Sequence, residues 1–548
     1  MKTYTNPVYA YERSLDQDAP PPRRPVIVVG AGPVGLAAAI DLAQRGVPVV
    51  VLDEDDTVSV GSRAICYAKR ALEILDRLGC GERIANKGVE WNVGKVFFRH
   101  DEVYAFNLLP ERGHGRPAFV NLQQYHLEEC LVDRLAELPR AEVRWRHKVV
   151  AVMQRDGHVL VRVATPEGEY ELTCDWLIAC DGARSAVRKM LGLEAEGQMF
   201  HDRFLIADIR MKSDFPAERW FWFDPPFHPG HSALLHRQAD DVWRIDFQLG
   251  WDADPEAEKK PERILPRLHA MLGAEAEFDI EWASVYTFQC RRMQRFRHDR
   301  VLFAGDAAHV VSPFGARGAN SGFQDADNLA WKLWLVLAGR APDRLLDTYD
   351  IERVAAADEN ILNSTRATDF ITPKSPVSRM FRDAVLSLAK HHAFARKLVN
   401  SGRLSVPHVY RASLLNTPDA IGESFAGAMV PGAPAADAPV AGGGSPWLLH
   451  HLHEGFTLLA FGAAVSSDAA ATFAGDAIPC RVVQIEGGGS RVDGITVLQD
   501  PEGLVRERYD GEPGTCYLLR PDQHVCARWR RFDVDVVRAA IRRATCND

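Results

Sequence analysis

The stretch PVIVVGAGPVGLAAAIDLAQRGVPVVVLDE, residues 25–54, decides the fold. Residues 26–29 are a continuous apolar run, typical of a buried parallel strand, and the glycine turn GAGPVG follows directly. A helix is expected over 36–45, and Gly46 ends it before a second buried strand at 47–52. Asp53 ends that strand, about 20 residues after the glycines, where a carboxylate can accept hydrogen bonds from ribose hydroxyls. The stretch predicts a Rossmann-like unit for a dinucleotide without a ribose phosphate, either FAD or NAD.

Two later stretches separate FAD from NAD. Residues 176–180 form an apolar run that ends in Asp181, and residues 301–304 form another that ends in Gly305 and Asp306. A simple NAD dehydrogenase needs neither, whereas FAD extends a ribityl chain and a second phosphate beyond the adenosine site. We expect Asp306 to accept hydrogen bonds from ribityl hydroxyls. A helix that starts near 318–321 would point partially positive N–H groups at the flavin pyrimidine and so favour flavin reduction.

These motifs together resemble one known family. GAGPVG with Asp53, DGARSAVR at 181–188, and GDAAHVVSPFGARGAN at 305–320 followed by DADNLAWKL look like the group A flavoprotein aromatic hydroxylases. The resemblance is strong over residues 25–355, weak beyond them, and nearest to the phenol hydroxylase branch. It implies non-covalent FAD, NADH or NADPH as co-substrate, and O2.

The resemblance also implies which residues bind FAD. Arg63 matches an arginine that meets the FAD phosphates or ribityl region, and Gln124 matches a glutamine that starts a helix over the cofactor. The expected FAD-binding set is Gly30, Gly32, Pro33, Gly35, Asp53, Glu54, Arg63, Gln124, Asp181, Gly305, Asp306, Pro313, Gly318, Ala319 and Asn320. No metal site is expected.

One position departs from the family pattern. The family usually carries Gly-Gly-Gln-Gly in the last turn, and this chain has Gly315-Ala316-Arg317-Gly318. Arg317 is either a catalytic cation that steadies reduced flavin or an anionic substrate, or a solvent-facing or phosphate-paired arginine. The sequence leaves both interpretations open.

Residues 200–295 carry strand signals, as in FLIADIRM, RWFWFD and DVWRIDFQLGW. In the family, such a sheet covers the flavin ring and walls the substrate pocket. We expect the substrate to contact Trp222, His231, Arg237 and Gln289 of this segment, together with Pro313. His236 and Tyr286 are the candidate bases for the substrate's phenol.

The implied reaction is hydroxylation of a phenolic ring ortho or para to its hydroxyl, through a flavin C4a-hydroperoxide. Such a reaction fits the catabolism of aromatic or nitroaromatic compounds. An epoxidase or halogenase on the same scaffold stays open, although RWFWFDPP has Asp224 where a similar halogenase stretch has isoleucine. A non-catalytic binding protein with a flavoprotein fold is a third alternative, and the intact glycines, Asp181 and Asp306 disfavour it.

Composition bounds the remaining possibilities. The 548-residue chain is 46% hydrophobic with a net charge of −9, which fits a soluble globular protein and disfavours nucleic-acid binding. It shows no secretory signal and no run of about 18 apolar residues, so no membrane partner is expected. We expect a cytoplasmic protein with ten reduced cysteines. The expected partner is a small phenol, and a homodimer is compatible with these features.

The expected fold class is α/β: a Rossmann-like FAD-binding domain with an inserted β-sheet substrate domain, as in p-hydroxybenzoate hydroxylase, plus a thioredoxin-like C-terminal domain. The expected parts are an N-terminal arm at 1–24, the FAD-binding domain at 25–199 and 296–355, the substrate domain at 200–295, a helical segment at 356–427, a linker at 428–446 and the C-terminal domain at 447–548. Because no CxxC pair is present, the last domain is expected to be structural rather than redox-active.

Overall fold

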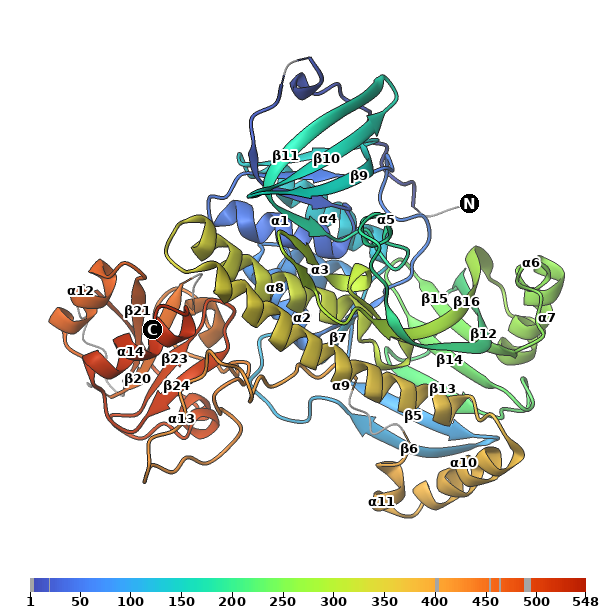
Figure 1. Cartoon of the computed structure of the whole chain (residues 1–548). Coiled ribbons are helices and arrows are strands. Elements are labelled where there is room, and N and C mark those ends of the chain that lie inside the picture. Colours follow the sequence, from blue (N-terminus) through green and yellow to red (C-terminus); the bar gives the residue numbers. More distant parts are fainter. Residues whose placement is uncertain (1–3, 19, 400–403, 453–454, 463–464, 487–493) are drawn as a thin grey trace.

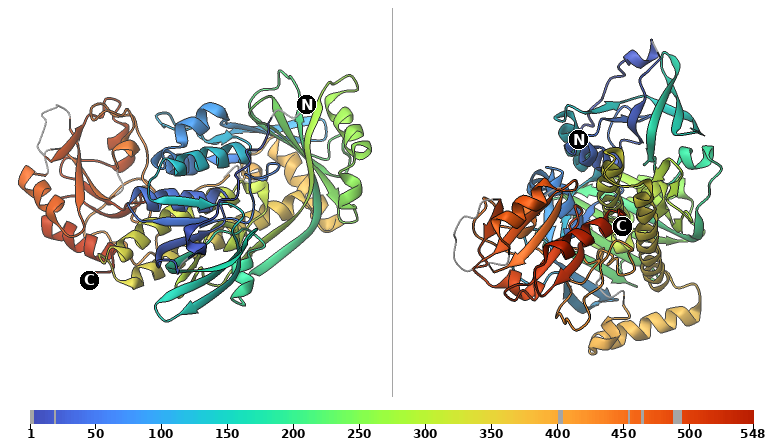
Figure 2. Two further views of the ribbon diagram at one scale, coloured as in Figure 1. Left: turned by 90° about the horizontal axis from the view of Figure 1, so that it is seen from above. Right: turned by 60° about the vertical axis from the view of Figure 1, so that its left-hand side comes forward.

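The computed structural model describes residues 4–18, 20–399, 404–452, 455–462, 465–486 and 494–548. Two eight-stranded sheets and a five-stranded C-terminal sheet make up its main body. Helices α8 (Gly318–Leu337) and α9 (Asp347–Ile371) run through the middle of the molecule, with the C-terminal domain on one side and the second sheet on the other (Figures 1 and 2). No helix among the described residues is long and apolar enough to cross a membrane.

The first sheet brings the predicted nucleotide-binding turns to one edge. Its order is β17 (Arg297–His298), β18 (Val301–Phe303), β11 (Gly168–Ala179), β1 (Arg24–Val29), β2 (Val49–Leu52) and β8 (Ala141–Arg144), with β9 (Lys148–Arg155) and β10 (His158–Thr165) extending from β11. β1, β2, β11 and β18 are parallel neighbours, so their carboxyl ends meet. Gly30, Asp53, Asp181 and Gly305 therefore gather at one place, as the sequence predicts.

Helix α1 (Pro33–Gln44) lies against α8 beside this edge. A Cβ atom at Gly322 would lie 2.4 Å from a methyl group of Val34, so only glycine allows the two helices to approach this closely. The smaller elements of this half are β3 (Cys66–Ala68), α2 (Lys69–Arg77), α3 (Gly81–Lys87), β4 (Val89–Trp91), β7 (Phe119–Asn121), α4 (Gln124–Ala136) and α5 (Ala186–Met190).

The second sheet has one face toward the FAD-binding edge and one face away from it. Its order is β19 (His309–Val310), β16 (Asp279–Arg292), β12 (Glu196–Arg210), β15 (Val242–Gly250), β14 (Ser232–Arg237), β13 (Arg219–Phe223), β5 (Val93–Phe98) and β6 (Asp101–Asn107). The face that carries Phe204, Leu234 and Phe288 packs on Phe314, α9 and α10 (Pro376–Ala389), and we call it the inner face. The outer face packs on α7 (Pro261–Leu272), which follows the short α6 (Pro255–Glu258).

Several observed segments differ from the expected boundaries. β5 and β6 lie within 25–199 of the chain, yet β5 pairs with β13 of the second sheet and β6 pairs with β5, so both extend that sheet. The expected helical segment at 356–427 contains α9, α10 and α11 (Ala393–Arg396) but no helix in its described part from 404 onward. A strand at the edge of a sheet has unpaired backbone N–H and C=O groups, and a segment from elsewhere in the chain can pair with them. The position of a segment in the sequence therefore does not reveal which sheet it joins.

The expected linker at 428–446 is packed rather than free. Its alanines, among them Ala433, Ala435 and Ala438, are buried in the core of the C-terminal domain. Small side chains allow this extended segment to lie flat against neighbouring strands. The expected N-terminal arm is also attached in its described part, because Tyr9 stacks on Trp145 at 4.4 Å and Asp16 accepts hydrogen bonds from Arg144 and Arg24.

The C-terminal domain contains a mixed sheet with the order β22 (Ile495–Leu498), β21 (Cys480–Ile485), β20 (Phe456–Phe461), β23 (Cys516–Leu519) and β24 (Val525–Trp529). β20, β21 and β22 are parallel, and β23 and β24 are antiparallel additions. The helices are α12 (Ser467–Gly475), α13 (Leu504–Tyr509) and α14 (Val534–Ala544). The thioredoxin-like assignment stays a prediction, and all ten cysteines are free thiols.

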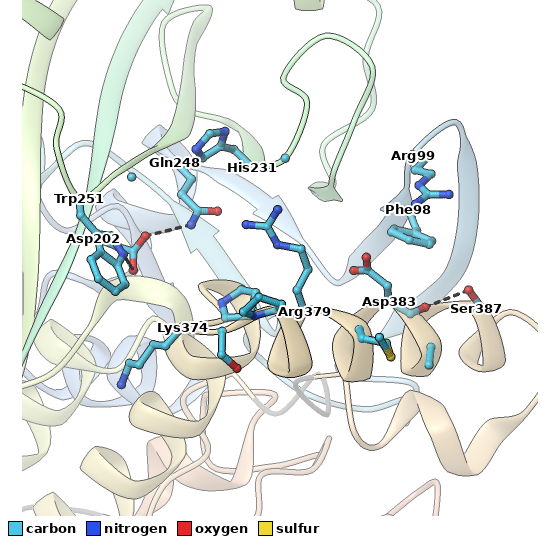
Figure 3. Close-up of a pocket in the computed structure, with 17 residues that line it drawn as sticks. Phe98, Arg99, Asp202, His231, Gln248, Trp251, Lys374, Arg379, Asp383 and Ser387 are labelled. Carbon is cyan, nitrogen blue, oxygen red and sulfur yellow. Dashed lines mark hydrogen bonds between the residues drawn. The ribbon is translucent and has the colours of Figure 1, made fainter.

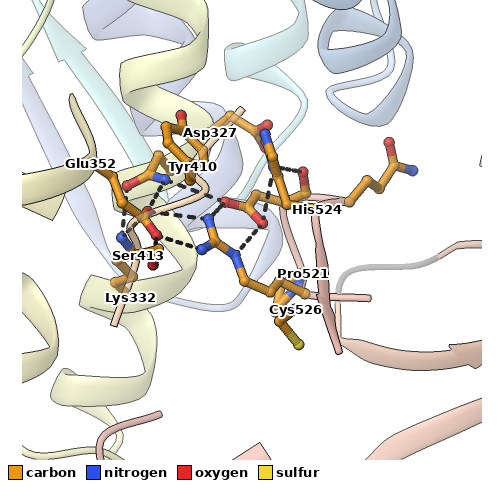
Figure 4. A network of polar contacts seen from close by, with 12 residues as sticks. Asp327, Lys332, Glu352, Tyr410, Ser413, Pro521, His524 and Cys526 are labelled. Carbon is orange, nitrogen blue, oxygen red and sulfur yellow. Dashed lines mark hydrogen bonds and ion pairs between the residues drawn. The ribbon is translucent and has the colours of Figure 1, made fainter. Parts of the chain in front are cut away.

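A buried polar network joins this domain to α8 and α9 (Figure 4). Glu352 of α9 accepts hydrogen bonds from Lys332 of α8 at 2.7 Å and from Arg520, at the end of β23, at 2.6 Å. Arg520 also pairs with Asp522, and all four side chains are at most 2% exposed. Burial lowers the pKa of Lys332 to about 8, opposed by Glu352. Complete pairing of these charges is what makes their burial tolerable.

We expect Arg520→Met to lower the stability of the protein strongly. The change leaves the buried carboxylates of Glu352 and Asp522 without their shared cation, which costs about 3–5 kcal/mol for a broken buried pair. The matched control is Arg162→Met, which removes an exposed pair with Glu171 worth about 0–1 kcal/mol. Urea denaturation of both variants measures the difference, and equal effects would contradict this account of the interface.

Candidate active site

The turn after β1 can form only with glycine at position 30. Gly30 has φ +104°, and a Cβ atom there would lie 2.6 Å from the carbonyl oxygen of Cys180 on the neighbouring strand. Helix α1 begins at Pro33 right after the turn, so its first N–H groups face the space above the sheet edge. A ligand phosphate at this helix N-terminus would meet unpaired donors and a favourable dipole.

Asp53 is fixed at the mouth of this turn. Its Oδ2 accepts a hydrogen bond from the N–H of Ala31 at 2.5 Å, and its Oδ1 accepts one from Asp55 at 2.8 Å. Burial raises the pKa of Asp53 to about 6, opposed by these two backbone donors. Glu54, which the sequence also places in the FAD site, is exposed and pairs with Lys148 at 2.7 Å. Of these two acids, Asp53 is the one held at the glycine turn.

Gln124 holds the loop that carries Arg63. Its side-chain oxygen accepts from the N–H of Ala64 at 3.0 Å, and its amide donates to Ser59 at 2.9 Å and to Glu128 at 2.8 Å. The amide is thus occupied by protein partners, which indicates a positioning role. Arg63 itself is exposed at the site, and its charge acts on both Tyr286 and Asp306.

The two later motifs are tied to each other. Arg188 donates to the carbonyl oxygen of Ala307 at 2.6 Å and to that of Ala183 at 2.8 Å, which links the β11 turn to the β18 turn. Asp181 accepts from Val187 through Oδ2 at 2.9 Å, while its Oδ1 is shielded from solvent and has no partner among the described residues. Buried polar atoms are normally hydrogen-bonded, so this oxygen has the capacity to accept from a ligand donor.

Asp306 follows Gly305 in the turn after β18. The side chain is reachable from solvent, yet the surrounding protein desolvates the carboxyl group and raises its pKa, opposed by His309 and Arg63. Its neighbour Gly305 has φ +60° and donates its N–H to Asp325 at 2.9 Å. Asp325 also accepts from His309 at 2.7 Å and from Arg353 at 2.6 Å, so three groups fix the turn.

The turn that leads into α8 is pinned by Asn320. Its side-chain oxygen accepts from the N–H of Ala68 at 2.8 Å, and its amide donates to the carbonyl oxygens of Cys66 and Ala316. Gly318 and Ala319 form the first helical turn beside it, and Pro313 is exposed at the opposite end of the turn. Only the backbone of Asn320 remains for the cofactor.

Arg317 is buried rather than solvent-facing, with an exposed fraction of 6%. It donates to Asn360 of α9 at 3.3 Å, and burial lowers its pKa while Glu359 opposes that shift. The side chain therefore lies toward α9, behind the turn, and the solvent-facing alternative is wrong. The catalytic and phosphate-paired interpretations stay predictions.

The assembled groups fit FAD. Two helix N-termini, the carboxylates of Asp53 and Asp306, and the open Oδ1 of Asp181 line one edge of the first sheet. At Gly32 nothing lies within 4 Å of where a Cβ atom would stand, so there is free space above the turn. This donor set suits a long ligand with a phosphate, a ribose and a polyhydroxyl chain.

A row of polar side chains on the inner face lies next to this edge. The antiparallel registers place Arg219, His236, Arg244 and Asp208 side by side on β13, β14, β15 and β12, and each is at most 8% exposed. Arg219 donates to the carbonyl oxygen of Phe314 at 3.3 Å, and Arg244 donates to that of Arg63 at 3.3 Å. The row therefore contacts both the turn before α8 and the loop after β2.

The predicted substrate residues fall into different places. His236 is on the inner face, 3.9 Å from the sulfur of Cys66, and Tyr286 packs on the same face. Because side chains alternate along a strand, the other strand residues chosen from sequence point to the outer face, and these are Trp222, Arg237 and Gln289. They do not join the row.

Sequence reasoning missed Arg219 and Asp246. For Asp246 the signal was present in VWRIDFQL, where the apolar residues Trp243, Ile245 and Phe247 alternate with polar ones, whereas Arg219 lies outside this stretch. A strict alternation with charges on the second face predicts a sheet face that is buried and polar, which is unusual enough to mark a site.

A cavity of about 860 Å³ opens at the far end of the inner face, and we call it the distal cavity. Figure 3 shows Gln248 of β15 and His231, which directly precedes β14, across from Arg379 and Lys374 of the α10 region. Gln248 donates to Asp202 at 3.1 Å on its floor. His231 therefore lines this cavity rather than the polar row.

We expect Gly30→Ala to weaken FAD binding about tenfold or more, because the new Cβ atom would clash with Cys180 and strain the backbone by about 1–3 kcal/mol. The control is Gly46→Ala, which has φ +82° but no atom within 4 Å of the new Cβ. FAD titration of flavin-stripped protein measures both affinities, and an unchanged affinity in Gly30→Ala would show that the turn does not hold the cofactor.

Comparison with known proteins identifies the family of the chain. Residues 23–364 match the family model described as an FAD binding domain. The chain is 34% identical over 380 residues to a 12-dehydrotetracycline 5-monooxygenase/anhydrotetracycline 6-monooxygenase of Streptomyces rimosus, covering 67% of this chain and 73% of that protein. It is 28% identical over 518 residues to a 3-(3-hydroxy-phenyl)propionate/3-hydroxycinnamic acid hydroxylase of Escherichia coli, covering 92% and 91%.

A solved structure shares the fold of this chain. The crystal structure of the flavin-dependent monooxygenase PieE, in complex with FAD and substrate, superposes with a TM-score of 0.81 at 24% identity, covering 97% of this chain and 100% of that one. At that identity the likeness shows the fold alone, whereas the family match covers more than half of the chain. The chain belongs to the FAD binding domain family and is an FAD-dependent monooxygenase of the group A flavoprotein aromatic hydroxylases.

Proposed function

We propose that this protein uses NADH or NADPH and O2 to hydroxylate a phenolic ring ortho or para to its hydroxyl. The observation that carries the proposal is the buried polar row, which sets two guanidinium groups and a neutral imidazole beside the FAD-binding turns. An ionisable hydroxyl on an otherwise apolar ring suits such a row. The names of the relatives support the same substrate class, since one acts on a hydroxyphenyl compound.

The FAD contacts follow from the geometry of the edge. We assign the pyrophosphate to the turn at Gly30 and the start of α1, the ribose to Asp53, and the ribityl chain to Asp306 with Asp181 and Arg63 nearby. The start of α8 then faces the flavin ring. When bound, FAD supplies the redox chemistry that activates O2 for transfer to the ring.

The chain's own residues prepare the ring for that transfer. Phe204, Phe288 and Phe314 pack together on the inner face and exclude water from this side of the site. Burial, with Arg219 and Arg244, lowers the pKa of His236 well below its ordinary value, so the imidazole stays neutral and can hydrogen-bond a hydroxyl. The same two cations stabilise negative charge that develops on the phenol oxygen.

The test of this function is a panel of phenols with the FAD-loaded protein. We expect a yellow protein whose oxidation of NADH or NADPH is stimulated by a phenol and yields a hydroxylated product in amounts that match the cofactor consumed. Product must be measured, because consumption without product indicates uncoupled reduction of O2. Activity that requires added halide, or an epoxide as product, would assign the chain to the alternative reactions instead.

The distal cavity leads to a prediction about the size of the substrate. It is large enough for further rings, and its lining includes Arg99, Lys374 and Arg379. Ala384→Trp would place an indole in this cavity from the exposed side of α10. If extended polycyclic phenols reach the cavity, their KM should rise about tenfold or more while that of single-ring phenols stays unchanged.

The matched control is Leu388→Trp, which lies on the same helix, is exposed and does not line the cavity. Equal KM values for polycyclic phenols in both variants would show that substrates do not enter the distal cavity.

A further inference from the structure

Asp246 is a carboxylate on the inner face that the proposed reaction has not used. The registers place it on β15 between Leu234 of β14 and Ile206 of β12, both buried apolar residues. It follows Arg244 of the polar row by two residues on β15, so both side chains lie on the inner face. A carboxylate is thus set among apolar neighbours at the border of the row that faces the FAD edge.

The carboxyl group of Asp246 is not committed to the protein. Its Oδ1 is shielded from solvent and has no hydrogen-bond partner among the described residues. The residue as a whole is half-buried rather than fully enclosed. Asp208 in the same row differs, because both of its oxygens accept from Arg244 at 2.7 Å. Of these two carboxylates, Asp246 is the one with an oxygen left for a substrate donor.

The other ionisable groups that face this position are poor proton acceptors. The pKa of His236 is lowered by burial and by Arg219 and Arg244, so protonation of the ring is disfavoured. Burial raises the pKa of Tyr286 and raises that of the Cys66 thiol to about 12, so both keep their protons near neutral pH. These groups can donate hydrogen bonds, and they leave the role of base open.

Asp246 has the opposite character. Burial raises its pKa to about 7, Arg244 and Arg219 oppose that shift, and Asp208 adds to it. The group therefore changes its charge in the range where a general base is most useful. A perturbed carboxyl group beside a ligand site is a candidate functional group on physical grounds.

We propose that the Asp246 carboxylate accepts the proton of the substrate's phenol hydroxyl, which makes it the general base of the hydroxylation. The proposal rests on the proposed function. The O–H bond of the phenol breaks, its electron pair stays on the phenol oxygen, and the proton forms a new O–H bond on Asp246. The resulting phenolate lies near Arg219 and Arg244, and its ring is richer in electron density for attack by electrophilic oxygen.

The first test measures protons without turnover, using 4-nitrophenol and the oxidised FAD-loaded protein at pH 8. Binding the nitrophenolate anion beside Asp246 should force that carboxylate to take up about one proton from solution per ligand bound. Calorimetry in buffers of different ionisation enthalpy reports the uptake. Asp246→Asn should bind the ligand without it, and equal uptake in both proteins would overturn the proposal.

The second test uses stability and needs no ligand. A carboxyl group with a raised folded pKa destabilises the fold increasingly as pH rises from its unfolded value toward about 7. Asp246→Asn should therefore raise the melting temperature more at pH 8 than at pH 5. The matched control is Asp279→Asn, an exposed carboxylate on β16 of the same sheet, which pairs with Arg210 at 2.7 Å. A pH-independent effect at Asp246 would contradict its titration.

The third test is kinetic. Asp246→Asn should lower kcat for weakly acidic phenols by about 10²–10⁴-fold, the usual contribution of a general base. It should lower kcat much less for nitrophenols that are already ionised, and Asp246→Glu should recover part of the loss. Wild-type protein that hydroxylates no phenol would refute the proposed function, whereas an active wild type matched by Asp246→Asn would refute this inference alone.

Discussion

The site depends on one buried carboxylate, Asp325 of α8. It binds the N–H of Gly305, the imidazole of His309 and the guanidinium of Arg353, and it is inaccessible to solvent. Burial acts to raise its pKa, but His309 and Arg353 outweigh burial and hold the pKa below its ordinary value. The ionised carboxylate thereby fixes the β18 turn against the start of α8. Both segments belong to the proposed FAD site, so this one ion ties together the turn and the helix start on which that proposal depends.

The same chemistry extends outward from Asp325. Arg353 donates to the hydroxyl of Tyr410 at 2.7 Å, and one residue earlier in α9 Glu352 pairs with Lys332 and Arg520. A chain of buried charges therefore runs from the cofactor edge to the C-terminal sheet. This explains how a domain without a CxxC pair can matter to the enzyme, since it completes the pairing of charges that α8 and α9 cannot satisfy alone.

On the other side of the cofactor edge, the second sheet supplies the reactive environment. Its inner face joins aromatic rings, which exclude water, to a row of charges that is almost fully buried. Burial, together with the cations of that row, lowers the pKa of His236, whereas burial raises that of Asp246. The two shifts reverse the ordinary order, so the Asp246 carboxylate is a stronger base than the His236 imidazole on the adjacent strand, and the two neighbouring groups can take distinct roles.

The sequence by itself determined the first sheet and its nucleotide-binding turns, because short local motifs specify them. A glycine turn between a buried strand and a helix, and acids at strand ends, have a fixed structural meaning, and Gly30, Asp53 and Asp306 lie at one sheet edge as expected. Only the tertiary structure decided the substrate half. Which face of the sheet a strand residue occupies depends on whether its position along the strand is odd or even and on the register between distant strands. Trp222 therefore lies on the outer face, whereas Arg219 and Asp246 lie on the inner face. The insertion of β5 into that sheet and the burial of Arg317 against α9 are likewise long-range outcomes, which no pattern within a short window can encode.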